Sequence, residues 1–326
     1  MQFLSDHFDG TRFFNSWNPQ IPSFYKAIRW KLTSIPKKWP KKPHSFLIDL
    51  PPKRVQGNQL RVSFVGHSTI LIQTQGLNIL TDPIWSNRAS PYKNIGPKRY
   101  SPPGIPFEKL PPIDLVLITH NHYDHLDVST IKNICNAHHP RIITPLGNDR
   151  FLPPEAYSMK IETLDWHKFT TISDAITLHL LPCQHWSARG IFDKNKALWG
   201  VFVIETPGGN IYFCGDTGYE RNNFCQALQQ FGSFRFAALP IGAYEPRWLM
   251  KYAHMNPEDA VLAHKDLGEP YTIATHFETF QLTDEGFDDP RISLSVALNK
   301  HLMSPQKFRA LKIGEAWMVP ETSTKP

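Results

Sequence analysis

THNHYDHLD, residues 119–127, places three histidines and two aspartates directly behind a short apolar run. The run follows two prolines, which predicts a buried strand that begins after a turn. His120 and His122 lie two residues apart, so in an extended chain both rings leave the same face. Asp124 and His125 follow where the strand must give way to a loop, and can turn toward a second point. One short loop could therefore serve two metal ions.

The alternative is that these side chains bind no metal. A single histidine is more often a satisfied polar group than a ligand. Behind the core strand Leu115–Ile118, however, several donors and two carboxylates would compete for hydrogen bonds if they were buried without a metal. If they were exposed, they would have no reason to follow a core strand. The pattern therefore favours a metal site.

Composition limits the class of protein. Of the 326 residues 41% are hydrophobic, enough for a sizeable core in one large domain or two. No apolar run approaches the roughly 20 residues of a membrane-spanning helix, and Met1–Thr11 lacks the layout of a signal peptide. We therefore expect an intracellular protein, cytoplasmic or peripherally associated with a membrane. With no CxxC pair, we expect reduced and mostly buried thiols at Cys135, Cys183, Cys214 and Cys225.

Positive charge is concentrated at the N-terminus. Residues 1–61 hold 11 Lys/Arg and 3 Asp/Glu, whereas the remaining residues hold 24 and 26. Aromatic residues lie among these lysines, which suits an anionic membrane surface. The alternative is an arm that packs its rings on the protein and leaves its lysines in water. We expect residues 1–58 to form this arm and residues 59–320 one catalytic domain, and we expect no nucleic acid partner because no recognised binding module is present.

Short strands begin near Gln59. Turns at Gly66 and Gln75–Gly76 separate the first three into an antiparallel meander. His67, in the first turn, is expected to stabilise that turn by a hydrogen bond, with support of a metal ligand as the alternative. The long loop Asp82–Pro112 is expected to be functional or capping. Strands are expected at Leu60–Val65, Ile70–Thr74, Leu77–Thr81, Arg141–Pro145, Thr163–Ile172, Ile176–Leu181, Ile211–Cys214 and Tyr271–Ala274, and a helix at Val128–Ala137.

Three later strands also end in a potential metal ligand. Alone each is a weak indication, but with the first loop they complete two coordination shells of five imidazoles and two carboxylates. This set suits two divalent ions, with Zn²⁺ favoured and iron or manganese as alternatives. Because a hydroxide between two such ions is a nucleophile at neutral pH, hydrolysis is the expected class of reaction. We expect one ion at His120, His122 and His185, the other at Asp124, His125 and His276, and Asp216 as the bridge between them.

The same residues resemble the metallo-β-lactamase superfamily, through the HxHxDH loop, the later histidines and the GDTG aspartate. The resemblance implies an α+β fold, an αββα sandwich of two mixed β-sheets flanked by helices. Longer strings between Arg61 and about Glu315 are similar to the N-acylphosphatidylethanolamine-hydrolysing phospholipase D family. They are VGHSTILIQTQGLNILTDPIWSNRASP, GPKRY, LPPIDLVLITHNHYDHLD, LWGVFVIE, FCGDTGY and LPIGAYEPRWLMKYAHMNPEDAV.

This second resemblance implies a phosphodiesterase of the phospholipase D type with two metals. A hydroxide between the metals would attack the phosphorus of N-acylphosphatidylethanolamine, or of a related glycerophospholipid, and release phosphatidic acid and an N-acylethanolamine. The expected partners are this phospholipid and a membrane surface, and a homodimer is left open. The residues implied to take part in catalysis are Asp216, Asp124, His254 and Tyr123, of which His254 and Tyr123 would also bind the substrate.

His254 has an alternative role. It precedes Asn256–Pro257–Glu258, a helix-start signature, so it could cap that helix. The sequence also departs from the family at two places, with Ala253 where a glutamine is expected and Phe277–Glu278 in place of Trp–Gly. Glu278 brings an anionic side chain near a site meant for an anionic lipid, which bears on the identity of the substrate.

Two other functions remain open on the sequence. A hydrolase of the same superfamily that acts on a sugar-phosphate lactone, or on another soluble substrate, would use the same ligands. A metal-stabilised scaffold that associates with membranes would need no catalysis. Turnover of a lactone rather than a phospholipid identifies the first, and membrane binding that survives loss of Asp216 identifies the second.

Overall fold

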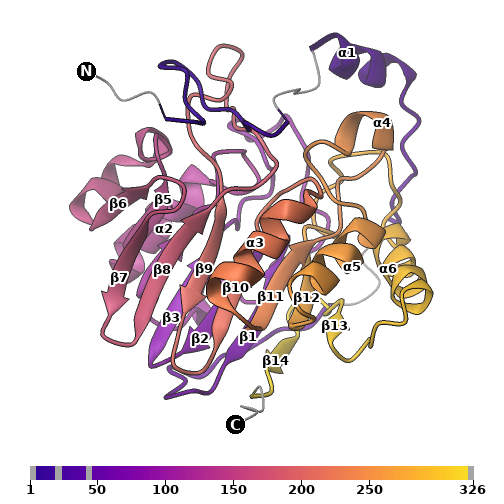
Figure 1. Ribbon diagram of the computed structural model, residues 1–326. Helices are drawn as coiled ribbons and strands as arrows, with labels where there is room; N and C mark the ends of the chain where they lie inside the picture. Colours follow the sequence, from indigo (N-terminus) through magenta and orange to yellow (C-terminus); the bar gives the residue numbers. More distant parts are fainter. Residues whose placement is uncertain (1–4, 19–23, 42–45, 322–326) are drawn as a thin grey trace.

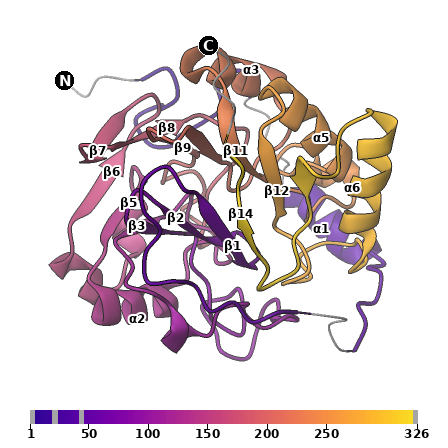
Figure 2. The same ribbon diagram turned by 90° about the horizontal axis from the view of Figure 1, so that it is seen from below.

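The computed structural model describes residues 5–18, 24–41 and 46–321. Within these ranges two seven-stranded β-sheets pack face to face, with helices on both outer faces (Figure 1, Figure 2). This confirms the expected αββα sandwich of two mixed sheets. The strands are β1 (Arg61–Gly66), β2 (Thr69–Thr74), β3 (Leu77–Thr81), β4 (Leu115–Leu117), β5 (Arg141–Pro145), β6 (Ile161–Leu164), β7 (Phe169–Ser173), β8 (Ile176–Leu181), β9 (Val201–Glu205), β10 (Asn210–Phe213), β11 (Phe234–Pro240), β12 (Tyr271–Thr275), β13 (Phe308–Arg309) and β14 (Ala316–Met318).

The directions of the strands determine which of them end at the same edge of the sandwich. The first sheet has the order β14-β1-β2-β3-β4-β5-β6 and the second β13-β12-β11-β10-β9-β8-β7. β1 to β3 form the predicted antiparallel meander, and β3 to β6 run parallel. In the second sheet β10, β11 and β12 are parallel, and β9 is antiparallel to both β8 and β10. β8, β10 and β12 therefore all end at the same edge.

The core follows the alternation of side chains along each strand. In β4, Leu115 and Leu117 belong to the main core between the sheets, whereas Val116 packs on the outer face with Ile134 of the α2 helix. Because both faces of this strand are covered, its sequence is continuously apolar. Burial of each such side chain contributes about 1.5–3 kcal/mol. These buried contacts fix the position of the end of β4, from which the loop of residues 119–127 starts.

Helices cover the outside of both sheets. Figure 1 shows α3 and α5 in front of the second sheet, and Figure 2 shows α2 on the far side of the first. The α2 helix starts after Asp127, whose side chain accepts a hydrogen bond from the Ser129 backbone N–H, and it ends one residue beyond the predicted range. The helices are α1 (Phe24–Thr33), α2 (Val128–His138), α3 (Arg221–Phe231), α4 (Arg247–Met250), α5 (Pro257–Asp266) and α6 (Asp289–Lys300), with 3₁₀ turns η1 (Phe107–Lys109), η2 (Asp149–Phe151) and η3 (Pro154–Ser158).

One predicted strand is wrong. The sequence predicts a single strand at Thr163–Ile172, but β6 pairs with β5 in the first sheet, and β7 pairs with β8 in the second. The chain turns between them, where the Lys168 backbone N–H donates to the Asp165 carbonyl over 3.1 Å. An apolar pattern does not show such a change of sheet, because both strands bury side chains in the same sandwich.

The N-terminal region packs along the sandwich in separate stretches. Phe13 belongs to the main core, and α1 lies beside α4 (Figure 1). Other apolar side chains of this region face solvent, among them Leu32 at 81% exposure and Ile35 at 90%. The region therefore combines packed and exposed apolar groups. No helix of the described ranges is long and apolar enough to span a bilayer.

Candidate metal centre

Four strand ends bring the seven predicted ligands to one edge of the sandwich. Three of these strands belong to the second sheet and run in the same direction, and the fourth, β4, belongs to the first sheet. The side chains form overlapping groups, in each of which the donor atoms lie within 4.8 Å of one another. They are His120, His122, Asp124 and His125 after β4, His185 after β8, Asp216 after β10 and His276 after β12.

Three imidazoles form the first group. The Nε2 atom of His120 lies 2.9 Å from Nδ1 of His122, and the Nε2 atom of His185 lies 3.3 Å from the same Nδ1. His120 and His185 are buried. Three converging ring nitrogens are the protein ligands of many catalytic zinc sites, which keep the fourth position for water or substrate.

Asp216 is the centre of the second group. Its Oδ2 atom lies 3.2 Å from Nε2 of His125 and 3.1 Å from Nε2 of His276. The Oδ2 atom of Asp124 lies 3.2 Å from the same His276 nitrogen. The Asp216 oxygen is also 3.9 Å from Nε2 of His185 in the first group. Asp216 thus lies between the two groups of side chains.

Hydrogen bonds on the far side of each ring orient the ring nitrogens. Nδ1 of His185 lies 2.9 Å from the Ala253 carbonyl, and Nδ1 of His125 lies 2.8 Å from Oδ2 of Asp82. Both acceptors place the ring proton on Nδ1, which leaves the Nε2 lone pair directed into the cluster. Contacts of this kind fix the tautomer of metal-binding histidines.

Burial keeps the first group neutral. It lowers the pKa of His120 and His185 well below the usual value, and it lowers the pKa of His122 to about 4. A neutral imidazole is the form that binds a metal ion. The three rings are therefore ready to bind a cation near neutral pH without losing a proton first.

The second group needs positive charge. Burial alone would lower the pKa of His125, but the carboxylates of Asp216, Asp124 and Asp82 outweigh it and raise that pKa well above its usual value. The Oδ1 atom of Asp216 is buried without a hydrogen-bond partner among the described residues. A divalent cation supplies the charge that these carboxylates require and a partner for this oxygen. The residues present therefore fit a metal ion.

The backbone around the cluster is strained. His67, Asp82 and His276 have φ angles of 58°, 35° and 62°, in the left-handed region that non-glycine residues rarely adopt. Each such residue costs on the order of 1–3 kcal/mol and persists only where the surrounding structure holds it. At Gly215, with φ 61°, a Cβ atom would lie 2.7 Å from the Thr119 side chain, so only glycine fits directly before Asp216.

His67 supports the carboxylate of Asp124, one of the predicted ligands. Its Nε2 atom lies 2.8 Å from Oδ2 of Asp124, and its backbone carbonyl accepts a 2.9 Å hydrogen bond from the N–H of His276. Burial lowers the pKa of His67 to about 3, so the ring is neutral and donates to the carboxylate. The structure thus favours the alternative that the sequence left open, rather than the expected turn hydrogen bond.

The sequence prediction missed Asp82. Its carboxylate accepts hydrogen bonds of 2.7 Å from the N–H and the hydroxyl of Thr119, in addition to its contact with His125. Asp82 follows the end of β3, the same position that the predicted ligands occupy on their own strands. A search of all strand ends for carboxylates would have found it.

Replacing Asp82 with asparagine is expected to weaken metal binding by about 10- to 100-fold, because the carboxylate orients His125 and adds negative charge behind it. Competition of the protein with a chromophoric chelator for Zn²⁺ measures this. Asp266→Asn is the matched control, since that carboxylate pairs instead with the Tyr219 hydroxyl at the end of α5. Equal affinities of the two variants would contradict the assigned role.

His254 lies at the cluster and does not cap the following helix. Its Nδ1 atom is 3.7 Å from Oδ2 of Asp216 and has no hydrogen-bond partner within the described ranges. The N-cap of α5 is Asn256, which forms a capping box with Asp259. The alternative of a capping histidine is therefore wrong. Burial lowers the pKa of His254 to about 4, so the ring is neutral near pH 7.

Tyr123 lies between the predicted ligands His122 and Asp124 in the chain, and its hydroxyl bonds to the loop after His185. Its hydroxyl donates a 2.6 Å hydrogen bond to the Arg189 carbonyl, and the Arg189 guanidinium lies 4.1 Å from the centre of its ring. The same guanidinium donates to the carbonyls of Asn121 and Leu126. Tyr123 lines a cavity of about 680 Å³ together with residues of the loop Asp82–Pro112, among them Tyr92.

The two departures from the family have structural counterparts. The carbonyl of Ala253, not its side chain, holds His185, so alanine keeps this contact. The Glu278 carboxylate is buried and bonded at 3.0 and 3.1 Å to the Arg291 guanidinium. The negative charge of Glu278, which the sequence places near the site, is therefore neutralised by the Arg291 guanidinium. Arg291 also lies 5.2 Å from the ring centre of Phe277.

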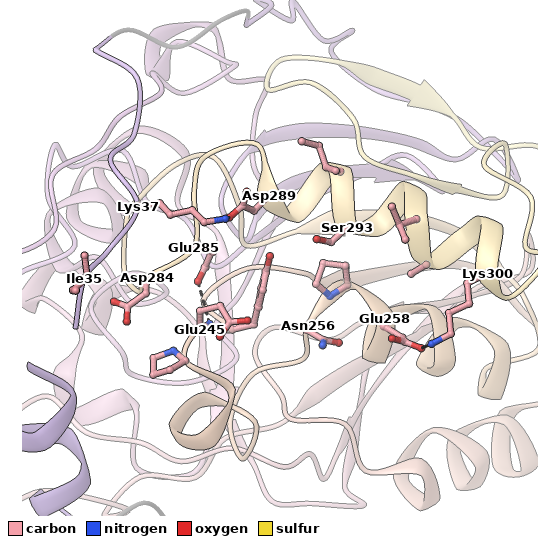
Figure 3. Close-up of a pocket in the computed structure, with 16 residues that line it drawn as sticks. Ile35, Lys37, Glu245, Asn256, Glu258, Asp284, Glu285, Asp289, Ser293 and Lys300 are labelled. Atoms are coloured by element: carbon pink, nitrogen blue, oxygen red, sulfur yellow. Dashed lines mark hydrogen bonds and ion pairs between the residues drawn. The ribbon is translucent and has the colours of Figure 1, made fainter. Parts of the chain in front are cut away.

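A second cavity, of about 650 Å³, contains none of the predicted site residues. Figure 3 shows Lys37 reaching Asp289 and Lys300 reaching Glu258 across its walls, with distances of 2.6 and 2.5 Å. Its other carboxylates accept hydrogen bonds from nearby side chains or backbone N–H groups, as Asp284 does from Trp30. The ion pair between Lys37 and Asp289 at this cavity joins the N-terminal region to the start of α6.

The sandwich and the His/Asp cluster at its edge define a metal-dependent hydrolase. Residues 77–277 match the family described as the β-lactamase superfamily domain, and the chain belongs to this superfamily.

The chain is also similar to individual proteins. The chain is 36% identical to N-acyl-phosphatidylethanolamine-hydrolyzing phospholipase D 1 of Caenorhabditis elegans over 269 residues, 79% of this chain and 75% of that protein. It is 32% identical to the mitochondrial N-acyl-phosphatidylethanolamine-hydrolyzing phospholipase D of Saccharomyces cerevisiae over 72% of this chain and about half, 51%, of the yeast protein. The solved structure of Igni18, a metallo hydrolase from Ignicoccus hospitalis, matches with a TM-score of 0.57 and 22% identity over 79% of this chain and 97% of that one, which shows the fold.

Proposed function

We propose that this protein hydrolyses N-acylphosphatidylethanolamine, or a related glycerophospholipid, to phosphatidic acid and an N-acylethanolamine. The observation that carries the proposal is the pair of donor groups that meet at Asp216, in a chain similar over most of its length to proteins named for this reaction. The reaction is a phosphodiester hydrolysis, in which water attacks phosphorus and the head-group alkoxide leaves with a proton.

Two divalent ions, Zn²⁺ by the nature of the donors, would occupy the centre. When bound, they supply Lewis acidity, lower the pKa of water so that it attacks at neutral pH, and offset charge that develops on the phosphoryl oxygens. One set of ligands would be His120, His122 and His185, the other Asp124, His125 and His276, with Asp216 shared between them.

The protein's own residues would position the reactants. Asp216 and Asp124 would carry the negative charge that binds the metals. Asp82 would orient His125, and His67 would orient the Asp124 carboxylate. Among the described residues the Nδ1 atom of His254 has no hydrogen-bond partner, and burial lowers the pKa of this histidine to about 4. The neutral ring beside Asp216 would therefore hydrogen-bond a phosphoryl oxygen or the leaving group. Tyr123, with its hydroxyl engaged, would bind substrate as one wall of the neighbouring cavity, which has room for a lipid head group.

A membrane would present the substrate at this edge. The α1 helix carries Lys26, Arg29 and Lys31 together with exposed Leu32, and the loop after His185 exposes Ile191 and Phe192 at 86% and 81%. Exposed apolar groups near basic residues suit insertion at the headgroup level of an anionic bilayer.

Exchanging these apolar residues for glutamate, in Leu32→Glu/Ile35→Glu and in Ile191→Glu/Phe192→Glu, is expected to reduce binding to phosphatidylserine-containing vesicles by more than about tenfold. The reason is that each side chain loses about 1.5–3 kcal/mol of apolar burial. Co-sedimentation measures the change. Leu302→Glu, at an equally exposed leucine outside both segments, is the control. Unchanged binding of both double variants would assign these residues to the aqueous surface.

The decisive experiment is incubation of metal-replete protein with N-acylphosphatidylethanolamine in mixed micelles, with mass identification of both products. Release of phosphatidic acid and N-acylethanolamine identifies the bond that is cleaved. No release by protein with confirmed metal content would reject the lipid and leave a soluble substrate, which a sugar-phosphate lactone would then test. Membrane binding that is retained without any turnover would point to a scaffold.

A further inference from the structure

Residues 13–18 of the N-terminal region lie against the metal centre and not on a remote surface. Asn15 is 1% exposed, and its side-chain amide donates a 2.9 Å hydrogen bond to the backbone carbonyl of His185. The same amide nitrogen lies 2.9 Å from the Tyr252 hydroxyl, and that hydroxyl donates to the Asn18 carbonyl over 3.0 Å. One buried side chain thus joins the loop of His185 to the loop that carries His254.

A neighbouring contact reaches the third loop of the centre. The indole N–H of Trp17 donates a 2.7 Å hydrogen bond to the side-chain carbonyl of Gln184. The backbone of Gln184 in turn bonds to the Thr217 hydroxyl and to the N–H of Gly218, the two residues that follow Asp216. The segment therefore contacts, directly or through one residue, the loops of His185, Asp216 and His254.

The segment also contacts the loop after His185. The Phe13 N–H donates to the Asn195 carbonyl over 2.8 Å, and the Asn195 side chain donates back to the Phe13 carbonyl over 3.0 Å. Asn195 also closes the loop by hydrogen bonds with Ser187. Because this loop has no helix or strand of its own, hydrogen bonds hold it in place, among them those between Asn195 and Phe13.

We propose that residues 13–18 are part of the metal centre and that Asn15 is a positioning residue for His185. The His185 ring is held from one side by the Ala253 carbonyl at its Nδ1 atom, and its backbone is held from the other side by Asn15. Together the two contacts aim the Nε2 atom at the group of three histidines. The inference rests on the proposed binding of two metal ions, but not on the identity of the substrate.

Asn15 acts on one of the two ion positions. His185 belongs to the group with His120 and His122, whereas His125 and His276 have separate supports in Asp82 and in the His67 backbone. A change at Asn15 therefore weakens the first ion selectively. Loss of an orienting contact of a metal ligand costs about 10- to 100-fold in metal affinity.

The test is a Zn²⁺ titration of the full chain against a chromophoric chelator, with metal content per chain measured after dialysis. In Asn15→Ala one of two zinc ions is expected to bind about 10- to 100-fold more weakly, while the other keeps its native affinity. Asn15→Asp fills the same volume but faces the His185 carbonyl with an acceptor, so it is expected to lose the same ion. Asn299→Ala, at an exposed asparagine of α6 outside this segment, is expected to retain both ions.

Other results overturn the proposal. Native affinity at both ions in Asn15→Ala, or in Asn15→Asp, would show that the amide does not position His185. Equal weakening of both ions, together with a lower unfolding temperature, would show that Asn15 only stabilises the fold. Because metal binding is measured directly, a protein that holds its ions as expected but releases no N-acylethanolamine would reject the proposed substrate and leave this inference intact.

Discussion

Asp216→Asn is expected to lower the rate of phosphodiester hydrolysis by about a thousandfold or more, equal to roughly 4 kcal/mol of transition-state stabilisation. The Oδ2 atom of Asp216 contacts the ring nitrogens of His125 and His276 and lies between the two donor groups. Asparagine has nearly the same volume, but it lacks the charge that would hold two cations close together. Initial rates with N-acylphosphatidylethanolamine, alongside metal content per chain, measure both consequences.

The matched control is Asp266→Asn, which removes a carboxylate from the end of α5. It is expected to hydrolyse the lipid at the native rate. Circular dichroism of both variants shows whether the fold is retained. Native turnover by Asp216→Asn, with the fold intact, would contradict the assignment of the catalytic centre to this cluster.

The second large effect is expected on the stability of the fold, at the ion pair between Glu278 and Arg291. In Arg291→Met the free energy of unfolding is expected to fall by about 3 kcal/mol, because the buried Glu278 carboxylate loses both of its guanidinium hydrogen bonds. Arg291 also donates to the carbonyls of Ala310 and Leu311, which would lose a partner. Urea unfolding followed by fluorescence measures the change.

Two variants separate the buried charge from the other contacts of Arg291. Glu278→Gln combined with Arg291→Met is expected to recover a large part of the loss, since no unpaired charge remains. Arg309→Met removes a similar pair, in which Arg309 contacts Glu315 and the Trp317 ring, but the carboxylate of that pair is more exposed, at 28% against 8% for Glu278. It is expected to cost at most about 1 kcal/mol. Equal losses in Arg291→Met and in the double variant would show that the charge of Glu278 is not the cause.

Much of the fold could be predicted because the local patterns are strong. The strand Leu77–Thr81, the strand Arg141–Pro145 and the start of the α2 helix at Val128 agree with the structure at those boundaries. Each has a periodic or continuous apolar pattern that ends at a turn or cap. The prediction failed at Thr163–Ile172, where two strands with similar patterns belong to different sheets.

The supporting residues of the centre could be predicted less well than the ligands. Histidines and aspartates directly behind apolar strands are recognisable because a core strand seldom ends in several metal-binding groups by chance. His67 and Asp82 act through single hydrogen bonds to residues more than 40 positions away. Asn15 is 170 residues from His185, and an asparagine in a polar segment gives no local signal of such a contact. Their roles depend on which loops the packed sheets bring together.

The sequence by itself determined most of the strand ends that it predicted and indicated a set of candidate metal ligands, because side-chain alternation and donor type are local properties of the chain. It indicated the class of fold through its resemblance to the metallo-β-lactamase superfamily. Only the tertiary structure decided which donors share a group, since that depends on the common direction of β8, β10 and β12. It also decided that Glu278 is neutralised by Arg291 and that Asn15 holds the His185 loop. These contacts join segments far apart in the chain, and the packing of the two sheets sets their geometry.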